Sequence, residues 1–369
     1  MIVDVHGHIT HPELFKRYPM PPALADIEGM LDRKSDAGIG VTIVGSPVGF
    51  GTMSKRGHDN YAQSADELKS FHEWLAETVR KHAPRLAAYV YTNPFGGSAL
   101  LDQTAQTVRD GGFVGLIVNT SVGGEYLDSP RADEFFAMAA ELGKPIFLHP
   151  PAEPVGSDSV EDFRLVEQVG RFVDVTVGLA TLVFASRLEQ YPDLELIAAT
   201  AGGAISLLAG RMDQAYQPRH WAGSGPPGGG GPPGGAPGGG GPPSGAPGGG
   251  GPSGGAPGGA PPGDGPPGGG GPGGGGSPGP PPMAQYTNKI TQPPSAYLRR
   301  VYVDTANSSV PNHLANLELM GADHMLFGTD SPPLATPLQD AIAMVDGLPI
   351  STAEKQGILE GNARRLFGL

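Results

Sequence analysis

The sequence predicts an α/β fold of the (β/α)8 TIM-barrel class, and three observations point to it. Eight short apolar segments recur along the chain, and they read like buried parallel strands bounded by turn residues. Stretches with helical spacing lie between them, and this alternation is the pattern of a barrel. No Gly-x-Gly-x-x-Gly follows the first segment, and polar or metal-binding residue types follow several others, which disfavours an open doubly wound sheet. The predicted strands are residues 2–5, 41–44, 86–91, 113–118, 145–148, 194–199, 300–303 and 324–327.

The segments between these strands carry the spacing of amphipathic helices. Residues 60–82 place apolar side chains three and four positions apart, from Leu68 to Val79, and the pattern ends before Pro84. Similar patterns predict helices over residues 131–142, 176–190 and 204–216. The apolar stretch 175–188 could pack on the barrel or against a second subunit.

A low-complexity segment interrupts the barrel between the sixth and seventh strands. Gly and Pro are concentrated in residues 223–282, without the strict period of three that a collagen triple helix needs. The segment offers almost no apolar side chains to offset the entropy of ordering, so we expect it to be disordered. A barrel tolerates such an insertion because the cost of loop closure grows slowly with length. We therefore expect one domain over residues 1–369, interrupted by a tolerated repeat expansion or by a partner-binding or lid segment.

Composition excludes several classes of protein. The formal net charge of −13 argues against a nucleic-acid-binding surface. No apolar run approaches the roughly 18 residues that a membrane span needs, and no signal peptide precedes the first strand. The chain contains no Cys, which rules out disulfides and thiolate chemistry. We therefore expect a cytoplasmic protein that binds neither nucleic acid nor membrane.

His6 and His8 follow the first apolar run and form one half of a predicted metal site. Side chains on a strand alternate, so both imidazoles point to the same side. His149 follows the fifth predicted strand, and Asp330 follows the eighth. The active site of such a barrel lies at the C-terminal strand ends, where the first and eighth strands are neighbours. These four residues predict one divalent metal ion, with Zn²⁺ as the first choice and Mn²⁺, Fe²⁺ or Co²⁺ as alternatives.

The motifs at these strand ends resemble those of the amidohydrolase superfamily. Within it, the chain is most similar to the aminocarboxymuconate-semialdehyde decarboxylase branch, also called amidohydrolase family 2. The resemblance covers the barrel from Met1 to about Gln214 and from Pro294 to Leu369. The motifs that carry it are DVHGH at 4–8, SPV at 46–48, IFLHP at 146–150, YPDL at 191–194, GGA at 202–204, VDTA at 303–306, FGTDSP at 327–332 and GNARRLFGL at 361–369.

The resemblance implies a barrel of the metal-dependent hydrolase type, with one metal ion held by His6, His8, His149 and Asp330. It also implies a homodimer that acts on an aromatic or muconate-type carboxylic acid. The leading hypothesis is therefore metal-dependent decarboxylation of a small aromatic or unsaturated carboxylic acid. The alternative is a hydrolase or hydratase that uses metal-activated water on a related acid.

One position departs from the family and supports a third hypothesis, a non-catalytic or altered-function barrel. Thr200 stands where the family has a His at the end of the sixth strand, and that His serves the decarboxylases as a general acid/base. A hydroxyl cannot take up a proton near neutral pH as an imidazole can. His11, His58 and Asp304 are the candidates to replace it.

The candidate site residues beyond the metal ligands follow from their places after the strands. We expect catalytic roles for Asp330, Thr200 and His11, and substrate-binding roles for Arg56, Asn93 and Asn119. The other histidines are expected to be solvated side chains in loops or on helix surfaces; they are His72, His82, His220, His313 and His324.

Overall fold

The computed structural model describes residues 1–12, 21–45, 61–216, 288–333 and 336–369. The chain divides into two compact units. The first unit, Met1–Gln217 with Asn288–Leu369, contains the barrel. The second unit, Pro218–Thr287, lies outside the described residues, and the predicted insertion 223–282 falls within it.

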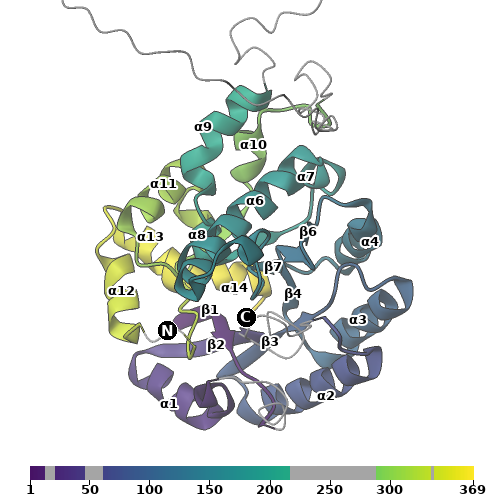
Figure 1. The fold of residues 1–369 in the computed structure, drawn as a ribbon. Coiled ribbons are helices and arrows are strands. Elements are labelled where there is room, and N and C mark those ends of the chain that lie inside the picture. Colours follow the sequence, from purple (N-terminus) through teal and green to yellow (C-terminus); the bar gives the residue numbers. More distant parts are fainter. Residues whose placement is uncertain (13–20, 46–60, 217–287, 334–335) are drawn as a thin grey trace, which may run out of the picture. The chain divides into compact units, whose positions relative to one another are not determined.

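Eight parallel strands form one sheet in the order β1-β2-β3-β4-β7-β8-β9-β10 (Figure 1). The sheet closes on itself because the backbone N–H of Val5 donates to the carbonyl of Phe327 (2.9 Å) and that of His8 donates to the carbonyl of Ser331 (3.3 Å). The predicted (β/α)8 barrel is confirmed. The strands are β1 Ile2–His8, β2 Ile39–Gly45, β3 Leu86–Tyr91, β4 Gly115–Asn119, β7 Ile146–His149, β8 Leu196–Ala198, β9 Tyr302–Asp304 and β10 Met325–Leu326.

Each predicted strand overlaps one of these strands, although most ends differ by one to three residues. The first strand continues past Val5 to His8, so both histidines belong to the strand itself. A short antiparallel hairpin, β5 Ser121–Val122 and β6 Glu125–Tyr126, has no counterpart among the predicted strands.

The helices surround the barrel (Figure 1). They are α1 Ile27–Asp36, α2 Ala65–His82, α3 Ser98–Gly111, α4 Asp133–Leu142, α5 Phe163–Leu165, α6 Arg171–Phe184, α7 Arg187–Gln190, α8 Ala199–Gly202, α9 Ile205–Tyr216, α10 Pro294–Leu298, α11 Val310–Met320, α12 Leu338–Asp346, α13 Thr352–Gln356 and α14 Asn362–Phe367. None of the described helices is long and apolar enough to cross a membrane.

Two predicted helices differ from the observed ones for local reasons. The helix expected over residues 60–82 begins at Ala65, because the Ser64 side chain accepts from the N–H of Glu67 and the Glu67 carboxylate accepts from the N–H of Ser64. The helix expected over residues 176–190 starts earlier, at Arg171, and is divided into α6 and α7 by Ser186, which has a φ of 64°.

The strands bury apolar side chains on both faces, as a parallel barrel requires. Phe147 and Tyr89 stack inside the barrel with ring centroids 5.3 Å apart. The opposite faces pack against the helices, and the face of α6 that carries Val175 and Leu179 is fully buried there. That apolar face of α6 therefore packs on the barrel and is not available to a second subunit.

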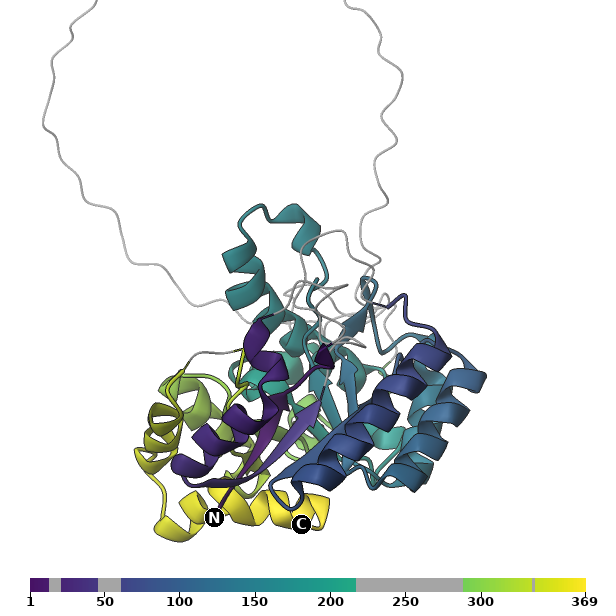
Figure 2. The ribbon, with the colours of Figure 1, turned by 90° about the horizontal axis from the view of Figure 1, so that it is seen from below.

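The C-terminal segment closes the end of the barrel where the strands begin. Phe367 of α14 lies edge-on to Tyr89, with ring centroids 5.9 Å apart, inside the inner apolar cluster. Figure 2 shows both chain termini at this end, where β1 starts. The C-terminal strand ends, with His8 and His149, lie at the other end.

Candidate metal centre

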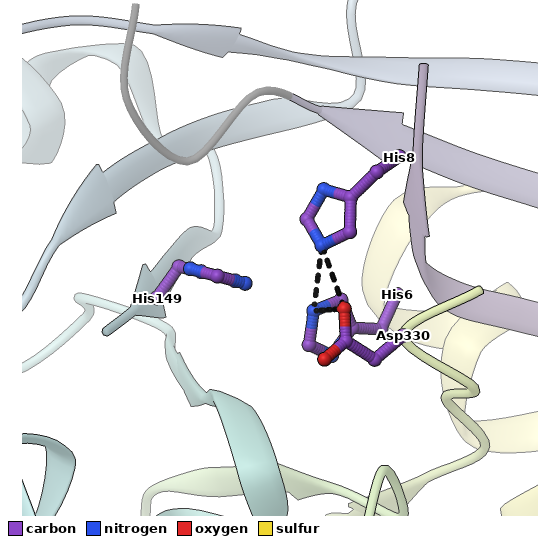
Figure 3. Close-up of side chains that lie close together, drawn as sticks. All are labelled: His6, His8, His149 and Asp330. Carbon is purple, nitrogen blue, oxygen red and sulfur yellow. Dashed lines mark hydrogen bonds and ion pairs between the residues drawn. The ribbon is translucent and has the colours of Figure 1, made fainter. Parts of the chain in front are cut away.

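His6 and His8 of β1 lie on one side of the strand, as the period of two predicts (Figure 3). Their Nε2 atoms are 3.1 Å apart, and both side chains are buried. His149 at the end of β7 joins them, with its ring about equally distant from both: the centroids are 5.1 Å from His6 and 5.0 Å from His8. The three imidazoles therefore face a common point at the C-terminal end of the barrel.

Asp330, which follows β10, completes the group. Its Oδ1 lies 3.4 Å from His6 Nε2 and 3.0 Å from His8 Nε2. One ligand atom from each of His6, His8, His149 and Asp330 lies within 4.8 Å of the others. Asp330 has a φ of 52°, in the left-handed region that Asp tolerates better than most residues. The sequence prediction that these four side chains converge is confirmed.

The other ring nitrogen of each histidine is held by a hydrogen-bond acceptor. Nδ1 of His6 lies 2.5 Å from Asp304 Oδ2, that of His8 is 2.9 Å from the carbonyl oxygen of Gly45, and that of His149 is 2.8 Å from the carbonyl oxygen of Pro150. Because Nδ1 donates, the neutral form of each ring has its lone pair on Nε2, which faces the shared point.

Lone pairs at this spacing repel one another unless a cation lies between them. His149 Nε2 is also a buried atom without a hydrogen-bond partner among the described residues. The donor set, three imidazole nitrogens and one carboxylate, suits a divalent transition metal. The residues present therefore fit the metal that the sequence predicts.

The charges of the four residues act on one another. Burial lowers the pKa of His6, but the carboxylates of Asp330 and Asp304 outweigh it, so the pKa lies above its ordinary value. Burial would raise the pKa of Asp330, but His6 and His8 hold that pKa well below its usual range. Burial, followed by the charges of His8 and His6, lowers the pKa of His149 well below its ordinary value. Asp330 is an anion and His149 a neutral imidazole at neutral pH, and these are the forms that bind metal ions.

A buried ion pair positions the segment that carries Asp330. Lys34 of α1 lies 2.5 Å from Asp4 Oδ2, and both side chains are fully buried. Asp4 also accepts from the hydroxyl of Thr329 (2.7 Å) and from the backbone N–H groups of Thr329 (3.1 Å) and His6 (3.0 Å). Asp4 thus ties β1 to the residue immediately before Asp330.

Asp304 at the end of β9 joins the metal centre to the segment that follows β8. Its Oδ1 accepts from the backbone N–H groups of Ala201 (2.8 Å) and Ala306 (3.1 Å), while Oδ2 contacts His6. Thr200 and Ala201 both adopt left-handed backbone conformations, with φ of 51° and 57°. Asp304 therefore supports a strained turn as well as a histidine. It is not a free acid/base that could replace the missing His.

A cavity of about 590 Å³ opens beside Asp330 and Thr200. This volume falls in the range of small-molecule sites, about 300–1,000 Å³. Its walls come from the segments around β7, β8, β9 and β10, from α6 and α12 and from the start of α11, and they include Pro150, Arg171, Thr200, Thr305 and Asp330.

The other predicted site residues have different surroundings. The ring of His11 packs edge-on against Trp74 of α2, with centroids 5.0 Å apart, and His11 is not among the described residues that line this cavity. Asn93 Oδ1 accepts from the N–H of Phe95 (2.9 Å), so Asn93 stabilises a turn. Asn119 is buried beside His149 and donates to its backbone carbonyl (3.4 Å).

Some predicted residues cannot be placed, and some expectations were wrong. Arg56 and His58 lie outside the described residues. The expectation that the remaining histidines are solvated is wrong for His72, His82 and His313, which are buried.

Sequence reasoning also missed Asp4, Lys34 and Arg171. Their only sequence signal is a charged residue within or beside an apolar pattern. The DVHGH motif contains Asp4 but gave no reason to assign it a role.

The comparisons with known proteins agree with this geometry. A family model described as amidohydrolase matches residues 3–224 and 268–369. The chain belongs to the amidohydrolase family. A 2-amino-3-carboxymuconate-6-semialdehyde decarboxylase from Dictyostelium discoideum is 23% identical over 174 residues, which are 47% of this chain and 46% of that protein. The chain spans about half the length of the curated relatives it matches.

Solved structures share the fold of this amidohydrolase. A 5-carboxyvanillate decarboxylase from Sphingomonas paucimobilis superposes with a TM-score of 0.72 and 15% identity, over 100% of this chain and 99% of the other. A dihydroxybenzoic acid decarboxylase from Polaromonas sp. JS666, with bound manganese and the inhibitor 2-nitroresorcinol, gives a TM-score of 0.67 and 18% identity, over 100% and 97%. At these identities the likeness shows a common fold.

Proposed function

We propose that this amidohydrolase is a metal-dependent decarboxylase that removes CO₂ from a small aromatic or unsaturated carboxylic acid. The observation that carries the proposal is the convergence of three imidazole nitrogens and the Asp330 carboxylate beside a substrate-sized cavity. The relative and the two structural neighbours are named as decarboxylases of small carboxylic acids, which supports the same reaction.

His6, His8, His149 and Asp330 would hold one divalent ion, with Zn²⁺ as the first candidate and Mn²⁺ as the second. A neighbour that contains manganese supports an ion of this kind. When bound, the ion would polarise substrate oxygens and stabilise the negative charge that develops as the C–C bond breaks.

The chain itself must deliver a proton to the carbon that loses CO₂. Asp330 contacts both histidines through Oδ1 and lines the cavity, so we assign proton transfer to its Oδ2. Since Asp330 is held ionised, its Oδ2 accepts a hydrogen bond from a bound water or a substrate hydroxyl and directs that proton toward the carbon. Thr200 lines the same cavity, and because its hydroxyl donates to the carbonyl of Ala199 (2.8 Å), it is assigned as a hydrogen-bond acceptor that orients the substrate. His11 remains a weaker catalytic candidate because its ring packs on Trp74.

Asn119 is the best supported of the predicted substrate-binding residues. It lies in register with His149 on the neighbouring strand, and its buried Oδ1 has no hydrogen-bond partner among the described residues. Because a buried acceptor without a partner is costly, we propose that Oδ1 accepts from a substrate hydroxyl. Arg56 stays a substrate-binding candidate that lies outside the described residues, and Asn93 is a weak one because it stabilises a turn.

The first experiment measures metal content by mass spectrometry on protein purified without chelators, for the wild type and His149→Ala side by side. We expect about one Zn or Mn per wild-type chain and its loss in the variant, because three ligands hold an ion more weakly than four. A screen of aromatic carboxylic acids for CO₂ release then tests the reaction. A folded wild type without stoichiometric metal contradicts the proposal.

The same screen separates the rival functions. A hydrolase or hydratase would use the same four ligands, and it would incorporate oxygen-18 from labelled water into its product without releasing CO₂. Thr200 is the observation that favours an altered or non-catalytic barrel. An altered or non-catalytic barrel would bind stoichiometric metal without converting any acid in the screen, or it would bind no metal at all.

The remaining expectations concern the setting of the protein. We propose a cytoplasmic homodimer. Three apolar side chains at the start of α6 and in the segment before it are half-exposed and offer a contact surface: Leu165, Val169 and Val173. Sedimentation of the wild type and of Val169→Glu tests the dimer, since a buried charge should shift the wild-type dimer to monomers.

A further inference from the structure

The turn that follows β8 has a positive φ at four successive residues. Thr200, Ala201, Gly202 and Gly203 have φ values of 51°, 57°, 71° and 60°. Glycine adopts such values freely, but a residue with a Cβ is strained there, because the Cβ crowds the following carbonyl oxygen. Left-handed residues other than glycine occur singly as a rule, so two in succession persist only where their surroundings hold them. Contacts from outside the turn must therefore hold Thr200 and Ala201 in this conformation.

Ala201 is held at both of its backbone polar groups by buried side chains. Its N–H donates to Asp304 Oδ1 (2.8 Å), and its carbonyl oxygen accepts from Nδ2 of Asn316 on α11 (3.0 Å). Asn316 is fully buried, and its Oδ1 accepts from the hydroxyl of Ser206 (2.6 Å). Because Oδ1 has this donor, the amide is oriented with Nδ2 toward Ala201. The two peptide groups that flank Ala201 are thus fixed, one by Asp304 and the other by Asn316.

α11 presents buried amides to this turn in place of an apolar stripe. Asn312 and Asn316, one helical turn apart, are 3% and 0% exposed, whereas Leu314 on the same helix is 39% exposed. Asn312 donates from Nδ2 to the carbonyl of Gly203 (2.9 Å), as Asn316 does to that of Ala201. A buried amide costs free energy unless it is hydrogen-bonded, so an ordinary barrel helix buries apolar side chains. The polar face of α11 is therefore matched to the carbonyls of the turn.

The turn is joined to the metal centre through Asp304. Oδ1 of Asp304 accepts from the N–H of Ala201 and from that of Ala306 (3.1 Å), while Oδ2 lies 2.5 Å from Nδ1 of His6. If the turn opened, Thr200 and Ala201 would relax toward the right-handed region, and the N–H of Ala201 would leave the carboxylate. Asp304 would keep one of these two backbone bonds and could rotate away from His6. The orientation of the imidazole therefore depends on the turn.

We propose that Asn316 is a positioning residue of the metal centre. It holds Ala201 in the left-handed conformation, and the N–H of Ala201 then holds the Asp304 carboxylate against His6. This inference rests on the metal site of the proposed function and is independent of the reaction. Asn316 is neither one of the four metal-site residues nor among the described residues that line the cavity, so it acts through the turn. Its loss should open the turn and weaken metal binding, with all four ligands still present.

Asn316→Leu tests the proposal, because leucine has a similar volume but no donor for the Ala201 carbonyl. Hydrogen exchange of residues 199–204, followed by mass spectrometry on metal-free protein, reports whether the turn opens. We expect the Ala201 amide to exchange about tenfold faster, since one hydrogen bond of ordinary strength is lost. Competition with a fluorescent chelator should show metal binding about three- to tenfold weaker, less than the roughly 10- to 100-fold that follows loss of a histidine's own partner. The loss is smaller because Ala306 still holds Asp304.

Asn362→Leu is the matched control. Asn362 is 3% exposed and donates from Nδ2 to the carbonyls of Ala322 and Met325 (2.8 Å each), at the end of the barrel where β10 begins. The same substitution there should lower the thermal unfolding midpoint, as it does at Asn316. It should leave the exchange of residues 199–204 and the metal affinity at their wild-type values. A merely structural role of Asn316 predicts that both variants behave alike.

Wild-type exchange or wild-type metal affinity in Asn316→Leu overturns the assignment, and so do equal changes in both variants. If Asn316→Leu does not fold, Asn316→Ser replaces it, because the serine hydroxyl fits the space but is too short to reach the Ala201 carbonyl. A wild type that binds no metal contradicts the proposed function. Faster exchange in the Asn316 variant then supports its role in holding the turn, and unchanged exchange overturns it. Weaker metal binding in that variant, with no CO₂ release from any of the proteins, supports the assignment and contradicts the decarboxylase.

Discussion

The imidazole Nδ1 of His6 lies 2.5 Å from Asp304 Oδ2, a contact between residues 298 positions apart in the chain. The other oxygen of Asp304 accepts two backbone N–H bonds, from Ala201 and Ala306. One carboxylate therefore fixes the tautomer of a metal-site histidine and the turn that carries Thr200.

We predict that Asp304→Asn weakens metal binding about 10- to 100-fold, the usual effect of losing the partner of a metal-binding histidine. If the amide oxygen keeps the two backbone N–H bonds, its NH₂ group must face Nδ1 of His6. That arrangement favours the tautomer with a proton on Nε2, which is then unable to bind metal. Competition with a fluorescent chelator at pH 7 measures the affinity.

Asp346→Asn is the control for this prediction. Asp346 is exposed at the end of α12 and does not line the cavity, and the change removes the same charge from the chain. Equal metal affinity in the wild type and Asp304→Asn would show that Asp304 does not tune His6.

The barrel and the four converging side chains could be predicted because they depend on short patterns. Apolar runs mark the strands, and in a closed barrel the strand ends meet at one rim, which places His149 and Asp330 beside His6. The start of α2 was not predicted, although Ser64 and Glu67 have the spacing of the capping box that marks it.

The supporting residues could not be predicted in the same way. Lys34 sits in an amphipathic helix, where a lysine usually faces solvent, and its contact with Asp4 depends on how α1 packs under β1. Arg171 lines the cavity and directly follows a π-helical turn, and periodicity alone does not reveal such a turn. Buried polar contacts between distant segments follow from the tertiary structure and leave no local signal.

The Asp4–Lys34 pair makes a prediction about stability. Lys34→Met leaves the fully buried Asp4 carboxylate without its cation, and removing one partner of a buried pair costs about 3–5 kcal/mol of unfolding free energy. Urea unfolding monitored by circular dichroism measures the loss.

The double variant Lys34→Met/Asp4→Asn, together with the two single variants, makes a double-mutant cycle. In the double variant, the amide oxygen at position 4 can still accept from the N–H groups of His6 and Thr329, and no charge remains unpaired. We therefore expect the double variant to be more stable than Lys34→Met alone. If the double variant loses as much unfolding free energy as Lys34→Met and Asp4→Asn lose together, these two side chains do not interact.

His72 makes a prediction about pH. It is buried on α2, where its Nε2 accepts from the N–H of Tyr91 (3.2 Å), and burial lowers its pKa to about 4. The unfolded chain, with a His pKa of about 6.5, binds the proton more readily than the folded protein below that pH. Stability is therefore complete above pH ~6.5 and falls by about 3 kcal/mol as the pH drops to ~4.

Urea unfolding of chelator-treated protein at several pH values checks this, with His72→Gln as the comparison. The amide keeps an acceptor for the Tyr91 N–H and does not titrate, so the variant should lose less stability between pH 6.5 and 4 than the wild type. If the unfolding free energies of the wild type and His72→Gln fall in parallel as the pH is lowered, other groups cause the pH dependence.

Thr200 offers a prediction that joins backbone strain to catalysis. Its φ of 51° and ψ of 44° are in the left-handed region, where a β-branched residue is disfavoured and His is several-fold more common. We expect Thr200→His to fold at least as stably as the wild type, with a gain of about 1 kcal/mol from relieved strain. The imidazole would then stand beside Asp330 in the cavity, where a positioned acid/base is worth about 10²–10⁴ in rate.

Thr200→Asn separates the two effects. Asn shares the tolerance for this backbone conformation but has no titratable group, so it should match Thr200→His in thermal stability without a gain in CO₂ release. Faster turnover in Thr200→His alone would show that the centre is intact and lacks only a proton shuttle. Equal rates in all three proteins would mean that the reaction does not use a group at this position, and proton transfer would then rest on Asp330.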